Sequence, residues 1–326
     1  MSHPERLGSS GGETVGTIAE SPHMNGTSGE SLADFAARNG LKQSAARPPL
    51  RKYVQDLWQR RTFIWNFATA KTAATYSGSR LGQLWQILTP LLNAGVYYLI
   101  FGLLLGQKKG IDNYTAFLIT GVFVFTFTQR SLTAGAKSVG NNLSLIRALH
   151  FPRASLPFAH VIMELQQLLI SMAVLMVIVL ATGEPLTWSW LLLVPALLLQ
   201  LVFNIGISLA IARTGAFVRD IQQLLPFITR TWLYLSGVFF LIPEKVASLD
   251  ENGYGWVGKI LEINPGAVFI ELVRGALMAS YDKDLAGVHG VTSQPTLWLY
   301  ALVWAVVAFA GGFWYFYRAE ERYGRG

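Results

Sequence analysis

Three long stretches of this chain contain no Asp, Glu, Lys, Arg or His, and this feature constrains the fold more than any other. They run over residues 81–107, 185–212 and 290–317. Each is longer than the roughly 20 apolar residues that an α-helix needs to cross a bilayer at about 1.5 Å per residue. Charged residues make up only 14% of the sequence, well below the quarter or so that is usual in soluble domains. The sequence therefore predicts an all-α polytopic membrane protein.

The apolar segments between polar flanks predict six transmembrane helices. Each of these segments counts as one span, because each is long enough to cross the hydrocarbon core. The predicted spans run at about 84–106, 114–133, 157–181, 189–212, 221–242 and 297–317.

The N-terminal region has a different composition. Residues 1–50 are rich in Gly, Ser, Thr and Glu and poor in large apolar residues, which predicts a disordered cytoplasmic tail. No apolar core of a signal peptide follows the first basic residues. Residues 51–78 place Leu57, Trp58 and Trp65 on one helical side and polar residues on the other, which predicts an interfacial amphipathic helix. A soluble helix packed against another domain is the alternative. Residues 79–326 form the predicted transmembrane domain.

Orientation follows from the Lys and Arg residues in the short flanks, since cytoplasmic loops carry an excess of them. In the long stretch 243–296, acidic residues outnumber basic ones, which indicates the extracytoplasmic side. Both termini are therefore predicted to face the cytoplasm. The flanks assigned to that side contain Arg60, Arg61, Lys71, Arg80, Lys137, Arg147, Arg153, Arg213, Arg219, Arg318, Arg322 and Arg325.

The segment INPGAVFIELVRGALM, residues 263–278, is apolar but too short to cross a bilayer. It opens with a helix-breaking Asn264-Pro265. We expect a re-entrant helical hairpin over about 255–280 that enters the outer leaflet before the last span; an extracellular helix on the membrane surface is the alternative. Glu271 and Arg274 are three positions apart and are expected to pair on one helical face, which lowers the cost of immersion.

Two further charges lie inside predicted spans. Glu164 lies about two turns into the third span, and Arg230 about two and a half turns into the fifth. A charge at the bilayer centre costs roughly 2.5–3.5 kcal/mol on insertion scales. We therefore predict an intramembrane pair between Glu164 and Arg230, with a substrate-facing arginine as the alternative.

No catalytic or metal-binding motif is found in the sequence. Cysteine is absent, and the five histidines are scattered. The segment TAGAKS, residues 133–138, has Ala136 where a phosphate-binding loop needs glycine. We predict that the chain is not an enzyme, has no metal site and binds no cofactor. If the chain takes part in energy-driven transport across the membrane, the energy therefore comes from another subunit or from an ion gradient.

The sequence resembles the ABC-2 type permeases at three places in order. FVRDIQQLLPFITRTWLYLSGVFF, residues 217–240, resembles that family's junction of the fourth and fifth spans, and INPGAVFIELVRGAL its Asn-Pro re-entrant segment. The entry to the first span matches a Tyr-x-x-Ser-x-Leu-Gly-x-x-Trp-x-x-x-x-Pro pattern, with Tyr76, Ser79, Leu81, Gly82, Trp85 and Pro90.

Within that family the chain is most similar to exporters of lipid-linked polysaccharides, such as O-antigen, teichoic acid and the galactan of mycobacterial cell walls. The resemblance implies a homodimer in the bacterial plasma membrane, with two cytoplasmic ATPase subunits that bind ATP and Mg. Its partners would be membrane lipids and a lipid-linked glycan, not nucleic acid. Residues 141–157 would form the coupling helix, with Arg147, His150 and Arg153 contacting the ATPase. Ordinary positive-inside anchors are the alternative for these three residues.

A channel for a sugar polymer needs weak binding along its length, which aromatic rings provide by stacking on sugar faces. One stripe of the first span and one of the fifth have this character. An aromatic residue in a span can also face lipid or pack between helices. Other functions left open are export of a small molecule or drug and a membrane-bound lipid-modifying enzyme. The predicted channel-lining residues are Asn93, Tyr97, Phe101, Trp232, Ser236 and Phe239.

Overall fold

The computed structural model describes most of the chain after the N-terminal tail. The chain divides into two units, Met1–Ala46 and Arg47–Gly326. Nearly all of the first unit, and with it most of the predicted tail 1–50, lies outside the described residues, so the following concerns the second. The described residues form helices joined by turns, with no strand among them, in agreement with the predicted all-α class. They are Arg38 and residues 48–77, 81–82, 84–104, 111–149, 151–218, 220–285 and 293–323.

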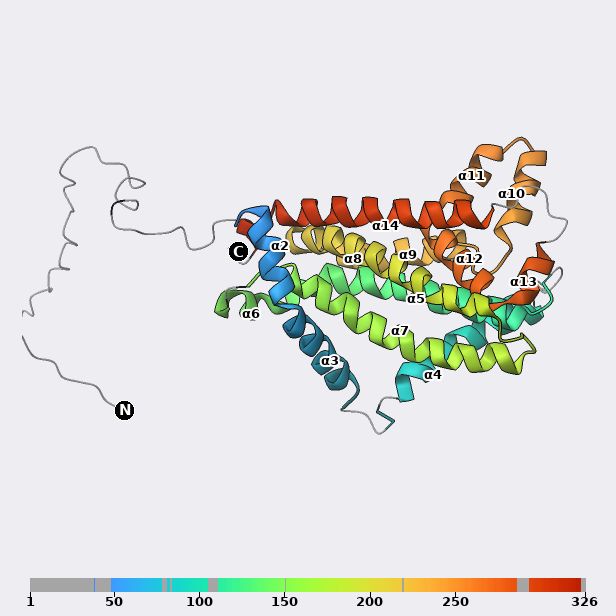
Figure 1. The fold of residues 1–326 in the computed structure, drawn as a ribbon, viewed down its shortest axis with the longest axis horizontal. Coiled ribbons are helices and arrows are strands. Elements are labelled where there is room, and N and C mark those ends of the chain that lie inside the picture. The colour runs from blue at the N-terminus through green and yellow to red at the C-terminus, as the bar shows by residue number, and fades with distance from the viewer. Residues whose placement is uncertain are drawn as a thin grey trace, which may run out of the picture. The chain divides into compact units, whose positions relative to one another are not determined.

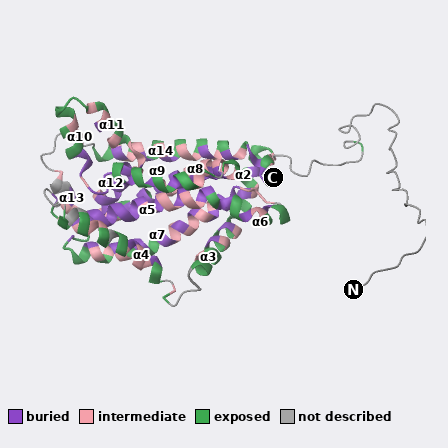
Figure 2. Ribbon diagram, turned by 180° about the vertical axis from the view of Figure 1, so that it is seen from behind, coloured by how far each residue is buried: buried purple, intermediate pink, exposed green. Residues whose placement is uncertain are grey.

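Four long helices run side by side through the second unit: α5 (Tyr114–Ser138), α7 (Ser155–Ala181), α8 (Leu193–Phe217) and α14 (Gln294–Tyr317) (Figure 1). Helix α5 packs against both α7 and α8, and α8 packs against α14. Burial follows this order, because α5 is buried along most of its length while the outer face of α14 is exposed (Figure 2). Helices that are apolar on every side are typical of a bundle core or a membrane.

Three helical segments are long and apolar enough to cross a membrane. They are Ser155–Ala181, Trp188–Phe217 and Gln294–Tyr317, with mean hydropathies of 2.1, 2.2 and 1.8. The second of these combines the 3₁₀ turn η3 (Trp188–Leu192) with α8. These segments contain the third, fourth and sixth predicted spans.

The first and fifth predicted spans have interrupted helices. In the first, α4 (Leu84–Tyr97) continues into a π-helix, η1 (Tyr98–Leu104). In the fifth, α9 (Ile221–Leu235) ends well before residue 242, so the prediction of one continuous helix over 221–242 is wrong. The reason is local, because Gly237 has a φ of 66°, in the left-handed region that favours glycine.

Short helices gather at the two ends of the bundle (Figure 1). Helices α2 (Leu50–Gln59) and α6 (Leu143–Ala148) lie at one end. Helices α10 (Ile242–Glu251), α11 (Gly255–Ile263) and α13 (Ala279–Asp284) lie at the other, with α12 (Pro265–Leu277) beside the bundle.

The predicted interfacial helix 51–78 is two helices, α2 and α3 (Arg61–Ser77), which meet at Arg60. The backbone N–H of Arg60 donates to the carbonyl groups of Asp56 and Leu57, which closes α2. Helix α2 buries Tyr53 and Leu57 against the chain itself, whereas Trp58 of its predicted apolar side is 70% exposed.

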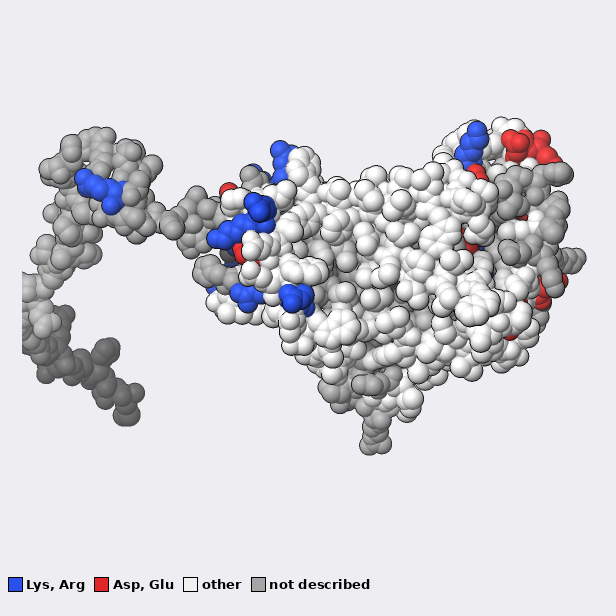
Figure 3. Space-filling view, in the orientation of Figure 1, with Lys and Arg blue, Asp and Glu red and all other residues white. Residues whose placement is uncertain are grey.

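Charged residues follow the same division (Figure 3). On the face shown, Lys and Arg gather over the end that carries α2 and α6, and acidic residues gather over the end that carries α10 and α13. The surface between the two ends is almost free of charge. On this face, a belt without charged side chains between two charged ends is the arrangement expected of a chain in a bilayer.

Helices α8 and α14 approach closely because glycine faces glycine. A Cβ atom added to Gly312 would meet the backbone of Gly206, and one added to Gly206 would meet the backbone of Ala308. Small residues allow such contact between membrane helices, where dispersion forces and backbone proximity provide much of the stability.

Replacing Gly312 by alanine is expected to destabilise the fold by about 1–3 kcal/mol, the usual cost of overpacking. The neighbouring Gly311→Ala is a matched control, because outside its own stretch of helix no described atom lies within 4 Å of an added Cβ. It should be neutral or slightly stabilising, since alanine is the better helix former. Thermal unfolding of both variants in detergent measures the difference, and equal midpoints would show that the glycine contact is unimportant.

Candidate functional site

Helix α12 is held at its first residue by the side chain of Asn264. The Asn264 Oδ1 atom accepts hydrogen bonds from the Gly266 N–H at 3.0 Å and from the Trp232 Nε1–H at 2.7 Å. Its Nδ2 group donates to the Leu235 carbonyl at 2.9 Å. The amide therefore caps α12 and at the same time ties it to the end of α9. A proline at the first helical position has no N–H that would need a partner.

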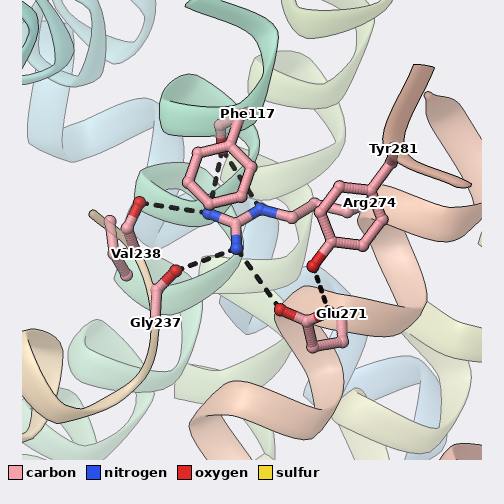
Figure 4. A network of polar contacts seen from close by, with 6 residues as sticks. All are labelled: Phe117, Gly237, Val238, Glu271, Arg274 and Tyr281. Carbon is pink, nitrogen blue, oxygen red and sulfur yellow. Dashed lines mark hydrogen bonds and ion pairs between the residues drawn. The ribbon is translucent and has the colours of Figure 1, made fainter. Parts of the chain in front are cut away.

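The far end of α12 is held by Arg274, which is fully buried (Figure 4). Its guanidinium donates to the Phe117 carbonyl at 3.0 Å and to the Gly237 carbonyl at 2.8 Å. A third bond reaches the Val238 carbonyl at 3.1 Å. The predicted partner Glu271 lies 3.5 Å away, in an ion pair between Nη1 and Oε1. We call these residues, with Tyr281, the Arg274 network.

The network also includes an aromatic layer and a glycine. The Phe117 ring lies over the guanidinium, with Cζ 3.3 Å from the ring centroid (Figure 4). The Tyr281 hydroxyl donates to Glu271 Oε2. A Cβ atom on Gly121 would lie 2.7 Å from the Arg274 Nη2 atom, so glycine makes room for the side chain. Arg274 thereby joins α12 to α5 and to the non-helical residues that follow α9.

The acceptors of Arg274 explain how a buried arginine is tolerated beside the interrupted fifth span. Where α9 ends, the carbonyl groups of Gly237 and Val238 receive bonds from Arg274. A buried charge is stabilised when it is both paired and hydrogen-bonded. Sequence reasoning found Glu271 and Arg274 but missed these acceptors, since a backbone carbonyl has no side-chain signature. The one sequence signal was the glycine in LSGVFF.

A second carboxylate at this end is Glu184, in the turn after α7. Asn113 Nδ2 donates to Glu184 Oε1 at 3.1 Å, and the Ser280 N–H donates to Oε2 at 3.1 Å. Burial raises the pKa of Glu184, but the hydrogen bonds from Ser280 and Asn113 outweigh it and lower the pKa below its ordinary value. An ionised Glu184 therefore joins the start of α5 to α13.

At the opposite end, the carboxylate of Glu320 joins three distant segments. The Tyr53 hydroxyl donates to Glu320 Oε2 at 2.9 Å, and the Arg153 N–H donates to Oε1 at 3.0 Å. The Ala154 N–H donates to the Tyr53 hydroxyl at 3.2 Å, and Arg153 Nη1 donates to the Glu320 carbonyl. Burial raises the pKa of Glu320, and the bonds from Arg153 and Tyr53 partly offset this. We call these four residues the Glu320 cluster.

The Glu320 cluster bears on the predicted ATPase contacts. Arg153 is engaged with Glu320 inside the chain, and Arg147 lies on α6 with an exposed side chain. His150 lies outside the described residues. Sequence reasoning missed Tyr53 and Glu320, which are 267 positions apart.

The structure does not bring Glu164 and Arg230 together, so that predicted pair is corrected. Glu164 is buried and lines a cavity of about 20 Å³ together with Arg130 of α5. Arg230 is exposed on α9. Depth alone suggested the pair, but the rotation of each helix about its axis decides which side chains face each other.

The two predicted channel stripes lie partly inside the packed chain. Ser236 and Phe239 are buried, with the Phe239 ring centroid 5.2 Å from that of Tyr97. In this structure the side chains of Ser236 and Phe239 do not face an open path. Asn93 is exposed and Tyr97 half-buried, while the side chain of Phe101 lies outside the described residues. Trp232 is half-buried, and its N–H is used by Asn264.

Comparison with known proteins gives a consistent set of matches. Residues 64–278 match the model of the ABC-2 type transporter family. The chain is 32% identical over 207 residues to the O-antigen export system permease protein RfbA of Klebsiella pneumoniae, covering 62% of this chain and 75% of that protein. It is 27% identical over 189 residues to the protein of that name from Myxococcus xanthus, covering 58% and 72%.

A more distant relative is the polysialic acid transport protein KpsM of Escherichia coli. It is 24% identical over 215 residues, which cover 63% of this chain and 77% of that protein. The family match extends across the whole of α12, with both Asn264 and Arg274.

Proposed function

Since this chain belongs to the ABC-2 type transporter family, we propose that it is the permease subunit of an ATP-driven exporter of a lipid-linked cell-surface polysaccharide. The observation that carries the proposal is the agreement among the named relatives. Those from Klebsiella pneumoniae and Myxococcus xanthus export O-antigen by name, and that from Escherichia coli transports polysialic acid. All are bacterial envelope glycans, which favours this substrate class over a small molecule.

In the proposed topology, six segments cross the bacterial plasma membrane and both termini face the cytoplasm. Residues 1–50 form a cytoplasmic tail and 51–78 lie in the interface. The charge distribution supports this orientation, because Lys and Arg gather at the end that carries α2 and α6 (Figure 3). The three long apolar helices support the crossings.

The α11–α12 pair is proposed to be the re-entrant hairpin. Its support comes from contacts with α14. The Trp304 Nε1–H donates to the Ile263 carbonyl at 2.8 Å, and Trp304 lies ten residues after the first residue of α14, or about 15 Å along it. At the other end of α12, a Cβ on Gly275 would lie 2.9 Å from the Nε2 atom of Gln294, at the start of α14. Helix α12 thus begins beside the middle of α14 and ends beside its first turn.

We propose that α6 and the residues after it receive the motion of a cytoplasmic ATPase that binds ATP and Mg. Arg147, which is exposed on α6, and His150 remain proposed contacts. Arg153 has a different proposed role, because it is bonded to Glu320. Through these bonds it would transmit displacement to the end of α14. Two copies of the chain and two ATPase subunits would form the transporter.

The proposed conduit lies along α4, where Asn93 and Tyr97 are accessible. The exposed Tyr234 extends this surface, since its ring centroid lies 5.5 Å from that of Phe239, which also contacts Tyr97. Aromatic faces bind sugars without a fixed hydrogen-bond register. Such a surface suits a polymer that must slide.

The test is reconstitution of the chain with its ATPase in liposomes that carry a labelled lipid-linked polysaccharide in one leaflet. ATP and Mg should transfer the label across the bilayer, while a variant ATPase that cannot hydrolyse ATP should not support transfer. ATP hydrolysis by the chain alone would contradict the proposal. Transport of small amphiphiles with no movement of the glycolipid would assign the chain to small-molecule export instead.

A further inference from the structure

An open groove of about 420 Å³ lies beside the start of α12, between α9, α11 and α14. Its volume is within the range of about 300–1,000 Å³ that is typical of ligand sites. Nothing in the proposed export path uses it. We call it the outer groove and define it by Trp232, Leu235, Lys259, Ile260, Ile263 and Trp304.

The lining of the outer groove selects a hydrocarbon ligand. Both indole N–H groups are used within the protein, by Asn264 Oδ1 for Trp232 and by the Ile263 carbonyl for Trp304. With these donors satisfied, the indoles and the aliphatic residues offer hydrophobic and dispersion contacts. A sugar would leave most of its hydroxyl groups without partners in such a groove.

The groove is open to the surroundings of the chain, and its apolar walls are exposed. Leu235 is 49% exposed, Ile260 61% and Ile263 42%. The contact between Trp304 and Ile263 lies about 15 Å along α14, close to half of the roughly 30 Å hydrocarbon core. The groove therefore lies at a depth that the acyl chain of a lipid in one leaflet reaches.

One cation lies among the lining residues. Lys259 is exposed on α11, about one turn before the Ile263–Asn264 turn. Among the described residues no ion pair joins Lys259 to Glu262, three positions further along α11. The ammonium group therefore has donors for an anionic headgroup beside the apolar residues of the groove, as in basic pockets that bind anionic lipids.

We propose that the outer groove binds one acyl chain of an anionic phospholipid, with the phosphate held by Lys259. The bound lipid would fill the space between the α11–α12 hairpin and α14 and would support the position of the hairpin. This proposal requires only that the chain lies in a membrane. It stands independently of which substrate the transporter exports.

Brominated acyl chains test the proposal, because bromine quenches the fluorescence of an indole that it contacts. The purified transporter is titrated with brominated phosphatidylglycerol and, separately, with phosphatidylcholine carrying the same brominated chains. The chain contains ten tryptophans, so the groove signal is the quenching lost in Trp304→Phe. We expect the anionic lipid to bind about fivefold more tightly, the contribution of one lysine near an anionic headgroup.

Two lysine variants provide the comparison. Lys259→Gln should abolish the preference for phosphatidylglycerol. Lys245→Gln should retain it, because Lys245 is exposed on neighbouring α10 and does not line the groove. Equal quenching by the two lipids in the unmodified protein, or an unchanged preference in Lys259→Gln, would overturn the proposal.

A second copy of the chain is the competing occupant, and a cysteine tests it. The sequence contains no cysteine, so Ile260→Cys introduces a single thiol at the groove. If lipid occupies the groove, oxidation should leave this variant uncross-linked. Disulfide-linked dimers would show that another copy covers the groove, and the lipid assignment would then be wrong. This variant keeps Trp304 and so remains informative if Trp304→Phe does not fold.

Discussion

Replacing Arg274 by methionine is expected to lower the free energy of unfolding by about 3–5 kcal/mol, the usual cost of breaking a buried ion pair from one side. The variant leaves the carbonyl groups of Phe117, Gly237 and Val238 without their bonds from the guanidinium, and it leaves the Glu271 carboxylate buried without its cation. Unpaired buried polar groups are costly because no solvent replaces the lost partner. Thermal unfolding in detergent and the recovery of monodisperse protein measure the loss.

The matched control is Arg318→Met at the end of α14. Arg318 is exposed, and its guanidinium carbon lies 4.3 Å from the centroid of the Trp314 ring. We expect its cost to be within about 0.5 kcal/mol. Similar unfolding midpoints for the two variants would show that the Arg274 network contributes little to stability.

A double variant separates the carboxylate from the carbonyl groups. Glu271→Gln alone keeps the three carbonyl bonds of Arg274, so it should cost less than Arg274→Met. Together, Glu271→Gln and Arg274→Met should cost less than the sum of the two, because the uncompensated carboxylate is gone. Strict additivity would show that the ion pair at 3.5 Å has no energetic coupling.

Replacing Glu320 by glutamine is expected to reduce export per ATP hydrolysed by about tenfold, while the complex still assembles. Glutamine keeps the volume but weakens the charge-assisted bonds from Tyr53 and Arg153. Coupling free energies of about 1–3 kcal/mol correspond to factors of roughly 5–150 in an equilibrium constant. Losing part of the coupling through Glu320 is therefore enough for a fall of about tenfold in export per ATP hydrolysed. Both rates are measured on the reconstituted transporter.

Tyr53→Phe provides an independent test of the same link. It removes the hydroxyl that donates to Glu320 and accepts from the Ala154 N–H, and it retains the aromatic packing against Tyr317. It should lower the ratio of export to hydrolysis in the same direction. Glu251→Gln, an exposed acid on α10, is the control and should leave the ratio unchanged. If export and hydrolysis fall equally in Glu320→Gln, the cluster has only a structural role.

The sequence predicted helices wherever the evidence was local. Gaps between charged residues located two of the three long apolar helices, Trp188–Phe217 and Gln294–Tyr317, and Asn264-Pro265 located the start of α12. The spacing of Glu271 and Arg274 also placed them within reach on one helix. Each of these depends on residues within a few turns of each other, where helical geometry fixes the neighbours.

The sequence was less informative wherever two segments meet. Arg230 was predicted to be the partner of Glu164 because the two lie at similar depth. The cation that shares a cavity with Glu164 is instead Arg130, which lies inside the predicted second span. The fifth span was predicted to extend to residue 242 because of its apolar composition. Composition does not reveal that the backbone of Gly237 adopts a left-handed conformation.

What the sequence determined by itself is the set of apolar helices, their polar ends and the membrane as their solvent. Only the tertiary structure decided that Arg274 bonds to backbone carbonyl groups and that Glu320 joins Tyr53 to Arg153. The physical reason is that composition and period fix a helix and its apolar faces. The rotation and axial shift of one helix against another depend on packing among residues far apart in the chain.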